Sequence, residues 1–311
     1  MTKPRILIVV DSPHWAHDRK SEALVTWLGD EFDVHKCYHA DLRPEALDAA
    51  DLVVVWYWMQ LAGSPAICAA LERNSDKLVL GICSHAELEG EKGQQGIAIL
   101  QQHGCAIFVH NRLLLAQWRR VFETRLYYTP NGVDLDHFRP TTRARRPGPL
   151  RIGWAGSLDN FGRDLRGFDL IEEACATTRD VEFVPAIKEE VHRSPDEMRG
   201  WYQDLDVYVC ASRSEGTPNP CLEAAASGLP LVTTAVGNMP EFLVDGVGGF
   251  FVERSVASIR AALEALAADP VLRARMSLAN LARVQDWSWA RQAERFRRMF
   301  RDCLERRLTR V

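Results

Sequence analysis

The sequence predicts an α/β protein made of two Rossmann-like domains, each a doubly wound parallel sheet, that face each other across a cleft. Three observations lead to this fold class. Short, continuously apolar strands alternate with helical stretches, which is typical of parallel strands covered on both faces. The alternation stops at a segment rich in proline and arginine that ends at Pro149, and then begins again. At 311 residues the chain is long enough for two domains with separate cores.

The first domain is predicted to cover residues 1–140. Its apolar runs have the length of strands, and the stretches between them have helical character. Strands are expected at Ile6–Val10, Val34–Cys37, Leu52–Trp56, Leu78–Ile82 and Ala106–Val109. Helices are expected at Lys20–Leu28, Pro65–Arg73, Gln94–Gln102 and Leu113–Phe122.

Residues 141–149 are predicted to form a linker, and residues 150–286 a second domain of the same kind. Its strands are expected at Leu150–Ala155, Val181–Pro185, Val207–Cys210 and Leu231–Thr234, with a short last strand after the turn at Gly246. Its helices are expected at Phe168–Thr177, Asp196–Leu205, Ser255–Ala267 and Asp269–Val284, and in the segment that begins at Asn219. An arginine-rich helix over 287–311, capped by Ser288, is expected to pack back on the first domain with its arginines in solvent.

Composition excludes several classes of function. A net charge of −4 and a pI near 6.2 do not favour a nucleic-acid partner. The longest apolar run, Leu52–Met59, has the length of a strand and not of a membrane span. The eight cysteines are scattered without a Cys-x-x-Cys pair, which favours reduced core thiols, a cytoplasmic location and no zinc site. Peripheral contact of the last helix with the inner face of a membrane stays open.

The segment from Ser212 to Thr234 carries the strongest signal. It places Glu215 and Glu223, with seven residues between them, across a junction from a loop to a helix. Asn219 is expected to cap this helix and Pro220 to be its first residue. Amide groups at a helix start are a good site for an anion such as a phosphate. A phosphate site between two carboxylates that can bind hydroxyl groups suits a nucleotide sugar.

This segment resembles the Glu-x7-Glu signature of the retaining glycosyltransferases of family 4, which have two facing Rossmann-like lobes. Further segments resemble motifs of that family in the same order. They are Pro130-Asn-Gly-Val-Asp134 with Phe138 and Pro140, Gly237-Asn-Met-Pro-Glu241, Asp245-Gly-Val-Gly-Gly249 and Ser288-Trp289. The resemblance implies transfer of a sugar, with retention of configuration, from a nucleoside-diphosphate sugar to an acceptor hydroxyl. It implies neither a metal nor another cofactor.

The resemblance also implies roles for residues of the second domain. Glu223 would bind the ribose and Glu215 the hydroxyl groups of the donor sugar, while a covalent nucleophilic role for Glu215 stays open. The distal phosphate and sugar would be held by the stretch Gly216, Thr217, Pro218 and Asn219.

The chain departs from the family between Gly156 and Gly167. Ser157 stands after Gly156, where the family usually has an arginine. Arg166 matches the usual lysine that stabilises the leaving phosphate, and Arg163 is expected to restore the missing charge. Lys188 is expected near the base or the ribose.

In the first domain, His85 matches a histidine that contacts the donor sugar in the family. The loop after the first strand lacks the usual glycines, and we expect Trp15 and its neighbouring histidines to form part of an acceptor platform. Trp56 and Trp58, at a strand end, are candidates for the same role. The acceptor itself stays open between a sugar, a lipid-linked glycan and a small molecule.

Other functions were weighed against this one. A nicotinamide-dependent oxidoreductase is disfavoured because no Gly-x-Gly-x-x-Gly follows Val10. A nucleotide-sugar epimerase of the same fold is disfavoured by the Pro130–Asp134 segment. A non-catalytic protein that binds nucleotide sugars finds support only in the departures at Ser157 and Trp15.

Overall fold

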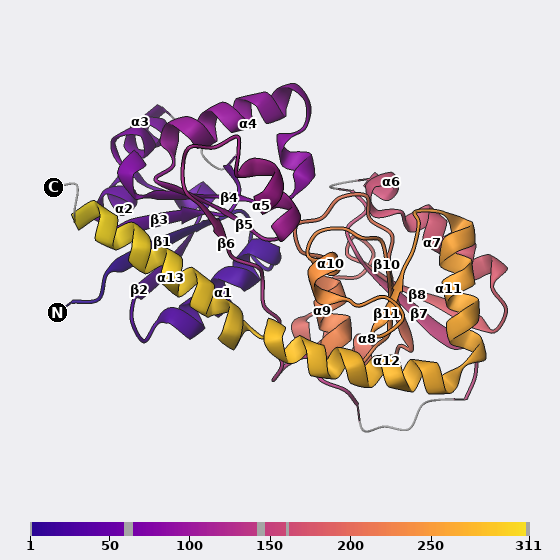
Figure 1. Cartoon of the computed structure of the whole chain (residues 1–311). Coiled ribbons are helices and arrows are strands. Elements are labelled where there is room, and N and C mark those ends of the chain that lie inside the picture. The colour runs from indigo at the N-terminus through magenta and orange to yellow at the C-terminus, as the bar shows by residue number, and fades with distance from the viewer. Residues whose placement is uncertain (1, 59–64, 142–146, 160–161, 309–311) are drawn as a thin grey trace. The chain divides into compact units, whose positions relative to one another are not determined.

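The computed structural model describes residues 2–58, 65–141, 147–159 and 162–308. The chain forms two compact units, of which one comprises Met1–Asn131 and Trp289–Val311 and the other Gly132–Ser288 (Figure 1). Each unit is built on one sheet in which all paired strands are parallel. The predicted fold class, two doubly wound parallel sheets, is therefore confirmed.

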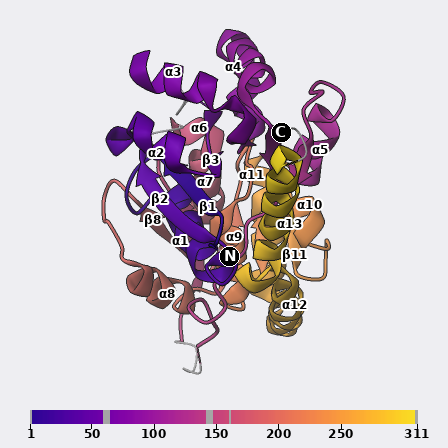
Figure 2. The ribbon, with the colours of Figure 1, turned by 90° about the vertical axis from the view of Figure 1, so that its left-hand side faces the viewer.

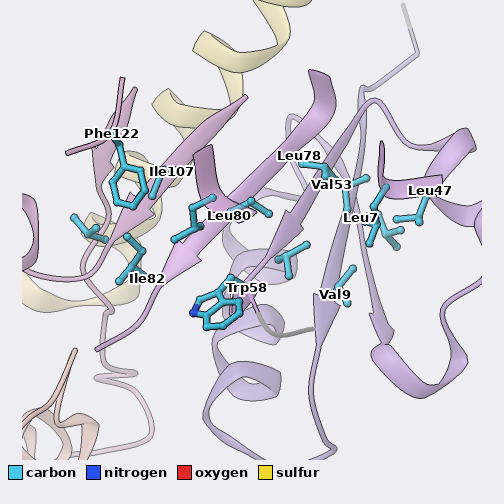
Figure 3. Close-up of a cluster of buried hydrophobic side chains, with 14 of the residues drawn as sticks. Leu7, Val9, Leu47, Val53, Trp58, Leu78, Leu80, Ile82, Ile107 and Phe122 are labelled. Atoms are coloured by element: carbon cyan, nitrogen blue, oxygen red, sulfur yellow. The ribbon is translucent and has the colours of Figure 1, made fainter. Parts of the chain in front are cut away.

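In the first unit the described strands follow the order β2-β1-β3-β4-β5-β6. They are β1 (Arg5–Val10), β2 (Asp33–Tyr38), β3 (Leu52–Val55), β4 (Leu78–Ile82), β5 (Ala106–Val109) and β6 (Leu126–Tyr128). The helices are α1 (Ala16–Leu28), α2 (Pro44–Ala49), α3 (Pro65–Arg73), α4 (Gly90–His103), α5 (Arg112–Trp118) and the terminal α13 (Trp289–Leu308). Successive side chains of a strand point to opposite faces. Leu7 and Val9 therefore join one buried cluster (Figure 3), whereas Ile6 and Ile8 join the cluster on the other face.

Helix α13 packs within the first unit beside α1 (Figures 1 and 2). Its apolar face, which includes Phe296 and Phe300, is buried against the sheet. The expectation that its arginines lie in solvent is wrong in part. Arg297 is buried and bonds to Asp30 at 3.1 Å and to Glu31 at 2.8 Å, because a guanidinium group at this depth needs acidic partners. None of the helices in the described part of the chain is both long and apolar enough to cross a membrane.

In the second unit the described strands follow the order β11-β10-β9-β7-β8. They are β7 (Leu150–Gly156), β8 (Val181–Ile187), β9 (Val207–Cys210), β10 (Leu231–Thr233) and β11 (Gly249–Phe251). The helices are α6 (Gly162–Arg166), α7 (Phe168–Thr177), α8 (Pro195–Gln203), α9 (Asn219–Ala226), α10 (Met239–Phe242), α11 (Val256–Ala268) and α12 (Pro270–Arg283). In parallel sheets of this kind, ligands bind beyond the carboxyl ends of the strands. The loops that follow β7, β8 and β9 are therefore the place to look for a site.

The boundary between the units differs from the prediction. The first unit ends at Asn131 and not at 140, because the side chains of Val133 and Phe138 are buried in the core of the second unit. The first unit resumes at Trp289 and not at 287. Trp287 still belongs to the second unit, because its ring packs edge-on against that of Phe242 with ring centroids 5.7 Å apart. Residues 142–146 of the expected linker and 309–311 of the expected last helix lie outside the described residues.

Most predicted elements appear with ends shifted by a few residues. Shifts of four residues occur at the start of α1, which begins at Ala16 and not at Lys20, at the start of α4 and at the end of α5. His14, just before α1, has a φ of 64°, and its N–H donates to the carboxylate of Asp18 at 2.8 Å. This contact fixes the start of the helix in a stretch without apolar periodicity. Helix α2 and strand β6 were missed because they are short.

Candidate nucleotide-sugar site

Helix α9 begins at Asn219, with Pro220 in its first turn, so Asn219 is the first helical residue and not the cap. The prediction of its cap was wrong by one residue. The N–H of Asn219 donates to Thr217 O at 2.9 Å, and that of Cys221 donates to Pro218 O at 2.9 Å. These two amides are thus engaged within the turn and do not form the expected anion cradle. The helix ends at Ala226, two residues before Gly228, which was predicted to stop it and whose φ of 82° suits glycine.

Glu215, in the loop between β9 and α9, forms an ion pair with Arg166 at the end of α6. It also accepts a hydrogen bond from the hydroxyl of Ser212 at 2.9 Å. Only 13% of the Glu215 side chain and 23% of the Arg166 side chain are exposed. Burial lowers the pKa of the Arg166 guanidinium, but the charge of Glu215 and the hydrogen bond to it, together with nearby Cys210 and Tyr208, outweigh burial, so the pKa is raised. Two predicted site residues are thereby brought together as a charged pair.

Glu223, on α9, accepts a hydrogen bond from the hydroxyl of Tyr202 at 2.8 Å. Tyr202 is fully buried, and burial together with the charge of Glu223 raises its pKa well above the ordinary value, so it stays a donor. Tyr202 lies on α8 and packs against Phe138 with ring centroids 5.7 Å apart. Sequence reasoning missed Tyr202, because its contact with Glu223 spans 21 residues.

Several buried polar atoms in or beside the loop before α9 have no hydrogen-bond partner among the residues that the structure describes. They are the hydroxyl oxygens of Ser214 and Thr217 and both side-chain polar atoms of Asn238. The neighbouring Gly237 lies against this loop, since a Cβ there would come within 2.7 Å of Gly216 O. Unsatisfied buried polar groups cost free energy that a polar ligand can recover. The loop from Gly216 to Pro218 is therefore suited to a polar ligand. Asn238, which lies beside it, was not among the predicted site residues.

In the loop after β7, Ser157 stands where the family usually has an arginine, and it contacts an acidic residue, Glu189. The hydroxyl of Ser157 donates to the carboxylate of Glu189, and the N–H of Leu158 donates to the same group at 3.1 Å. The adjacent Gly156 accepts a hydrogen bond from Lys188 N at 3.0 Å. Burial raises the pKa of Glu189, but the hydrogen bonds that its carboxylate accepts from Ser157, Leu158 and neighbouring backbone amides outweigh burial and lower the pKa, so Glu189 stays ionised. Nothing in the sequence pattern had pointed to Glu189.

Arg163 lies among acidic side chains of α7. Its guanidinium pairs with Asp169 at 2.6 Å and with Glu172 at 3.4 Å, and it lies over the ring of Phe168 at 4.5 Å. These pairs are exposed, and a role of Arg163 toward the diphosphate stays a prediction. Arg166 remains as the cation beside Glu215.

In the first unit, His85 lies in a short 3-10 helix, His85–Leu88, after β4. Its Nδ1 is 2.6 Å from the side-chain oxygen of Gln117, which requires the proton to be on Nδ1. His85 therefore lies beyond the carboxyl end of a parallel strand, as the sequence suggested, and is held by α5.

The tryptophan platform expected at a strand end is not formed. Trp56 is fully buried, stacks on His17 with ring centroids 5.8 Å apart, and donates from Nε1 to Ser21 at 2.8 Å. Trp58 is 5% exposed and packs in the core shown in Figure 3. Neither ring has a free face for a sugar. Trp15 is half-buried and caps the start of α1.

A polar cluster that sequence reasoning missed follows the strands of the first unit. Cys83 donates to Trp56 O at 2.9 Å and lies 3.5 Å from Nε2 of His110, whose Nδ1 contacts Thr129 O at 2.9 Å. Burial raises the pKa of the Cys83 thiol and lowers that of His110, so the pair is a neutral thiol and a neutral imidazole. Such a pair is not an activated nucleophile. Nearby, Nδ1 of His17 lies 3.2 Å from a carboxylate oxygen of Asp11.

Comparison with known proteins gives the family context. Residues 135–269 match the family model described as glycosyl transferases group 1. The matched segment lies within the second unit and contains Arg166, Glu215 and Glu223. A D-inositol 3-phosphate glycosyltransferase of Pseudarthrobacter chlorophenolicus is 29% identical over 206 residues, covering 54% of this chain and 48% of the relative. One of Arthrobacter sp. is 39% identical over 201 residues, covering 53% and 47%. The chain thus spans about half the length of the curated relatives it matches.

Solved structures share the fold over nearly the whole chain. Sucrose-phosphate synthase from Thermosynechococcus elongatus has a TM-score of 0.74 at 14% identity, covering 96% of this chain and 99% of that one. Anabaena HepE, in complex with UDP and glucose, has a TM-score of 0.74 at 12% identity, covering 96% and 100%. At this level of identity the likeness concerns the fold, which is the two-domain GT-B type.

Proposed function

We propose that this protein is a glycosyltransferase that moves a sugar from a nucleoside-diphosphate sugar to an acceptor hydroxyl, with retention of configuration and without a metal. The observation that carries the proposal is the Arg166–Glu215 ion pair in front of α9, together with Glu223, which lies one turn inside that helix. It lies in the segment that matches glycosyl transferases group 1. The Anabaena protein of the same fold is described in complex with UDP and glucose, which supports a donor of this class.

In this proposal Arg166 receives the diphosphate. As the bond to the sugar breaks, negative charge grows on the leaving phosphate, and a preorganised guanidinium group stabilises it. Arg166 is already fixed by Glu215 and keeps its proton. The polar groups of Ser214, Thr217 and Asn238, which have no hydrogen-bond partner among the described residues, give the bound donor further partners.

The two carboxylates divide the donor between them. Glu215 accepts hydrogen bonds from hydroxyl groups of the sugar, and Glu223, steadied by Tyr202, accepts them from the ribose. Lys188 contacts the base or ribose from the loop after β8. A front-face reaction, in which the leaving phosphate takes the acceptor proton, leaves Glu215 as a binding group. A covalent path would make Glu215 the nucleophile.

On the acceptor side we propose the Asp11–His17 pair, together with His85, at the carboxyl edge of the first sheet. Burial and the charge of Lys20 lower the pKa of His17, although Asp11 opposes them. The neutral imidazole then has one nitrogen toward Asp11 and a second that can accept a hydrogen bond from a hydroxyl group. This assignment replaces the stacking platform that was expected at Trp56 and Trp58.

The test is to incubate the purified chain with UDP-, GDP-, ADP- and TDP-sugars and to measure release of the nucleoside diphosphate, with and without simple glycoside acceptors. We expect release from one donor class, with the product keeping the anomeric configuration of the donor. Binding without release would favour the non-catalytic alternative. Interconversion of the nucleotide sugar without release would favour an epimerase.

A further inference from the structure

Two separate segments carry the Arg166–Glu215 pair, and they touch each other directly. Arg166 ends α6, while Glu215 lies in the loop after β9, 49 residues later. The N–H of Arg213 donates to Leu165 O at 2.9 Å. Gly167 has a φ of 65°, and a Cβ there would lie 2.3 Å from Ala211 O. The contact is therefore so close that only glycine fits at this point.

A third segment fastens these two segments to each other. Arg254 follows β11, and its Nε donates to Ala211 O at 3.1 Å. Its Nη2 donates to the carboxylate of Asp164 at 3.0 Å and also to the carbonyl oxygen of Asp164. Ala211 is fully buried, and 27% of the Arg254 side chain is exposed. One guanidinium group thus binds both the segment of Arg166 and the segment of Glu215.

Other contacts do not replace this one. The side chain of Arg213 also approaches Asp164, but at 3.7 Å and with 65% of it exposed, so it contributes little. The guanidinium fork of Arg254 makes its bonds in fixed directions, which a lysine ammonium group does not reproduce. Arg254 therefore adds a directional side-chain link to the backbone hydrogen bond from Arg213 N to Leu165 O, which already joins α6 to this loop.

We infer that Arg254 is a positioning residue, which holds α6 against the loop at Ala211 so that Arg166 and Glu215 stand ready for the donor diphosphate. The inference rests on the proposed function. Charged groups that act on a ligand need a support that locks their position, and small displacements cost much of their effect. Arg254 itself touches neither Arg166 nor Glu215 in the contacts described above, so it acts through the backbone that carries them.

The experiment measures affinity of the full chain for UDP, GDP, ADP and TDP by calorimetry and then follows the one that wild type binds most tightly. The variants are Arg254→Gln, Arg254→Lys, Arg166→Ala and the double variant Arg254→Gln/Arg166→Ala. Arg260→Gln is the matched control, because Arg260 is an exposed arginine of α11 that pairs with Glu264, one turn along the same helix, at 3.6 Å.

We expect Arg254→Gln to weaken binding about tenfold, which corresponds to about 1.4 kcal/mol, and Arg260→Gln to leave it unchanged. Arg254→Lys should recover only part of the loss. In the Arg166→Ala background, Arg254→Gln should add less than about twofold, because the residue whose position it secures is absent. All affinities are measured where circular dichroism shows folded protein, and Asp164→Asn provides a second way to break the contact if Arg254→Gln does not fold.

The outcomes separate the two hypotheses. If wild type binds none of the four diphosphates, both the proposed function and this inference are overturned. If wild type binds one of them and Arg254→Gln binds it equally well, only this inference is overturned. An equal loss with and without Arg166 would show a general structural role and would also overturn it.

Discussion

Replacing Glu215 by glutamine tests how the charged pair works, because the change keeps shape and removes charge. In the structure Glu215 is bonded both to Arg166 and to Ser212 and is largely buried. A buried hydrogen bond to a charged group typically contributes about 1.5–3 kcal/mol to the free energy of unfolding. Since both side chains keep some exposure, we expect Glu215→Gln to cost about 1–2 kcal/mol of stability, which lowers the melting temperature by about 2–8 °C in a domain of this size.

The effect on the ligand should depend on which part of the donor is present. Loss of the carboxylate that binds the sugar should lower kcat/KM with the complete donor about 10–150-fold, the equivalent of about 1.5–3 kcal/mol. Binding of the bare nucleoside diphosphate should be unchanged or tighter, because a neutral glutamine competes less with phosphate for Arg166 than the carboxylate does. Arg166→Ala should weaken the bare diphosphate and lower turnover about 10²–10³-fold.

The assay combines calorimetry with the diphosphate and initial rates with the complete donor, for both single variants and the double variant. The two residues touch, so their effects should not add, and we expect a coupling energy of about 0.5–3 kcal/mol. If Glu215→Gln abolished binding of the bare diphosphate while Arg166→Ala left binding and rate untouched, our placement of the donor would be refuted.

Three further results are expected. Glu223→Ala should weaken nucleoside-diphosphate binding, measured by calorimetry, by about 1–3 kcal/mol. Tyr202→Phe should weaken it less. If folded Glu223→Ala bound the diphosphate with the affinity of wild type, the ribose contact would be excluded. Activity should persist in EDTA, since Arg166 supplies positive charge to the leaving phosphate, and a strict requirement for an added divalent ion would contradict this. Burial raises the pKa of Glu87 to about 8 from an ordinary value of 4.5, so its contribution to stability is fully present below pH 4.5 and is lost as the pH rises to 8. The free energy of unfolding, measured by urea titration, should therefore fall in wild type relative to Glu87→Gln from pH 5 to pH 8, by at most about 1.4 kcal/mol per pH unit. A difference in this free energy that does not vary with pH would contradict the burial of this carboxyl group.

The sequence by itself determined the fold class and the segment of the candidate site. Strands such as Leu52–Val55 and Leu78–Ile82 are continuous apolar runs, and burial on both faces of a parallel sheet requires that pattern. Gly228, predicted to stop α9, follows its last residue by two positions, and its positive φ is a local backbone preference that the sequence can reveal. The sequence also predicted that Glu215 lies in a loop and Glu223 in the helix that follows it, and both lie there.

Only the tertiary structure decided the partners of these residues. The sequence offered Arg166 as the match of the usual lysine and Arg163 as a second cation, and only the fold shows that Arg163 pairs with acids of α7 and Arg166 with Glu215. Arg254 lies 90 residues from Asp164 and 43 from Ala211, and no local pattern relates them. Backbone preference and hydrophobic periodicity act over a few residues, whereas hydrogen bonds and ion pairs form wherever the packed sheet brings groups together. The elements could therefore be predicted from the sequence, but the pairing of their side chains depended on the fold.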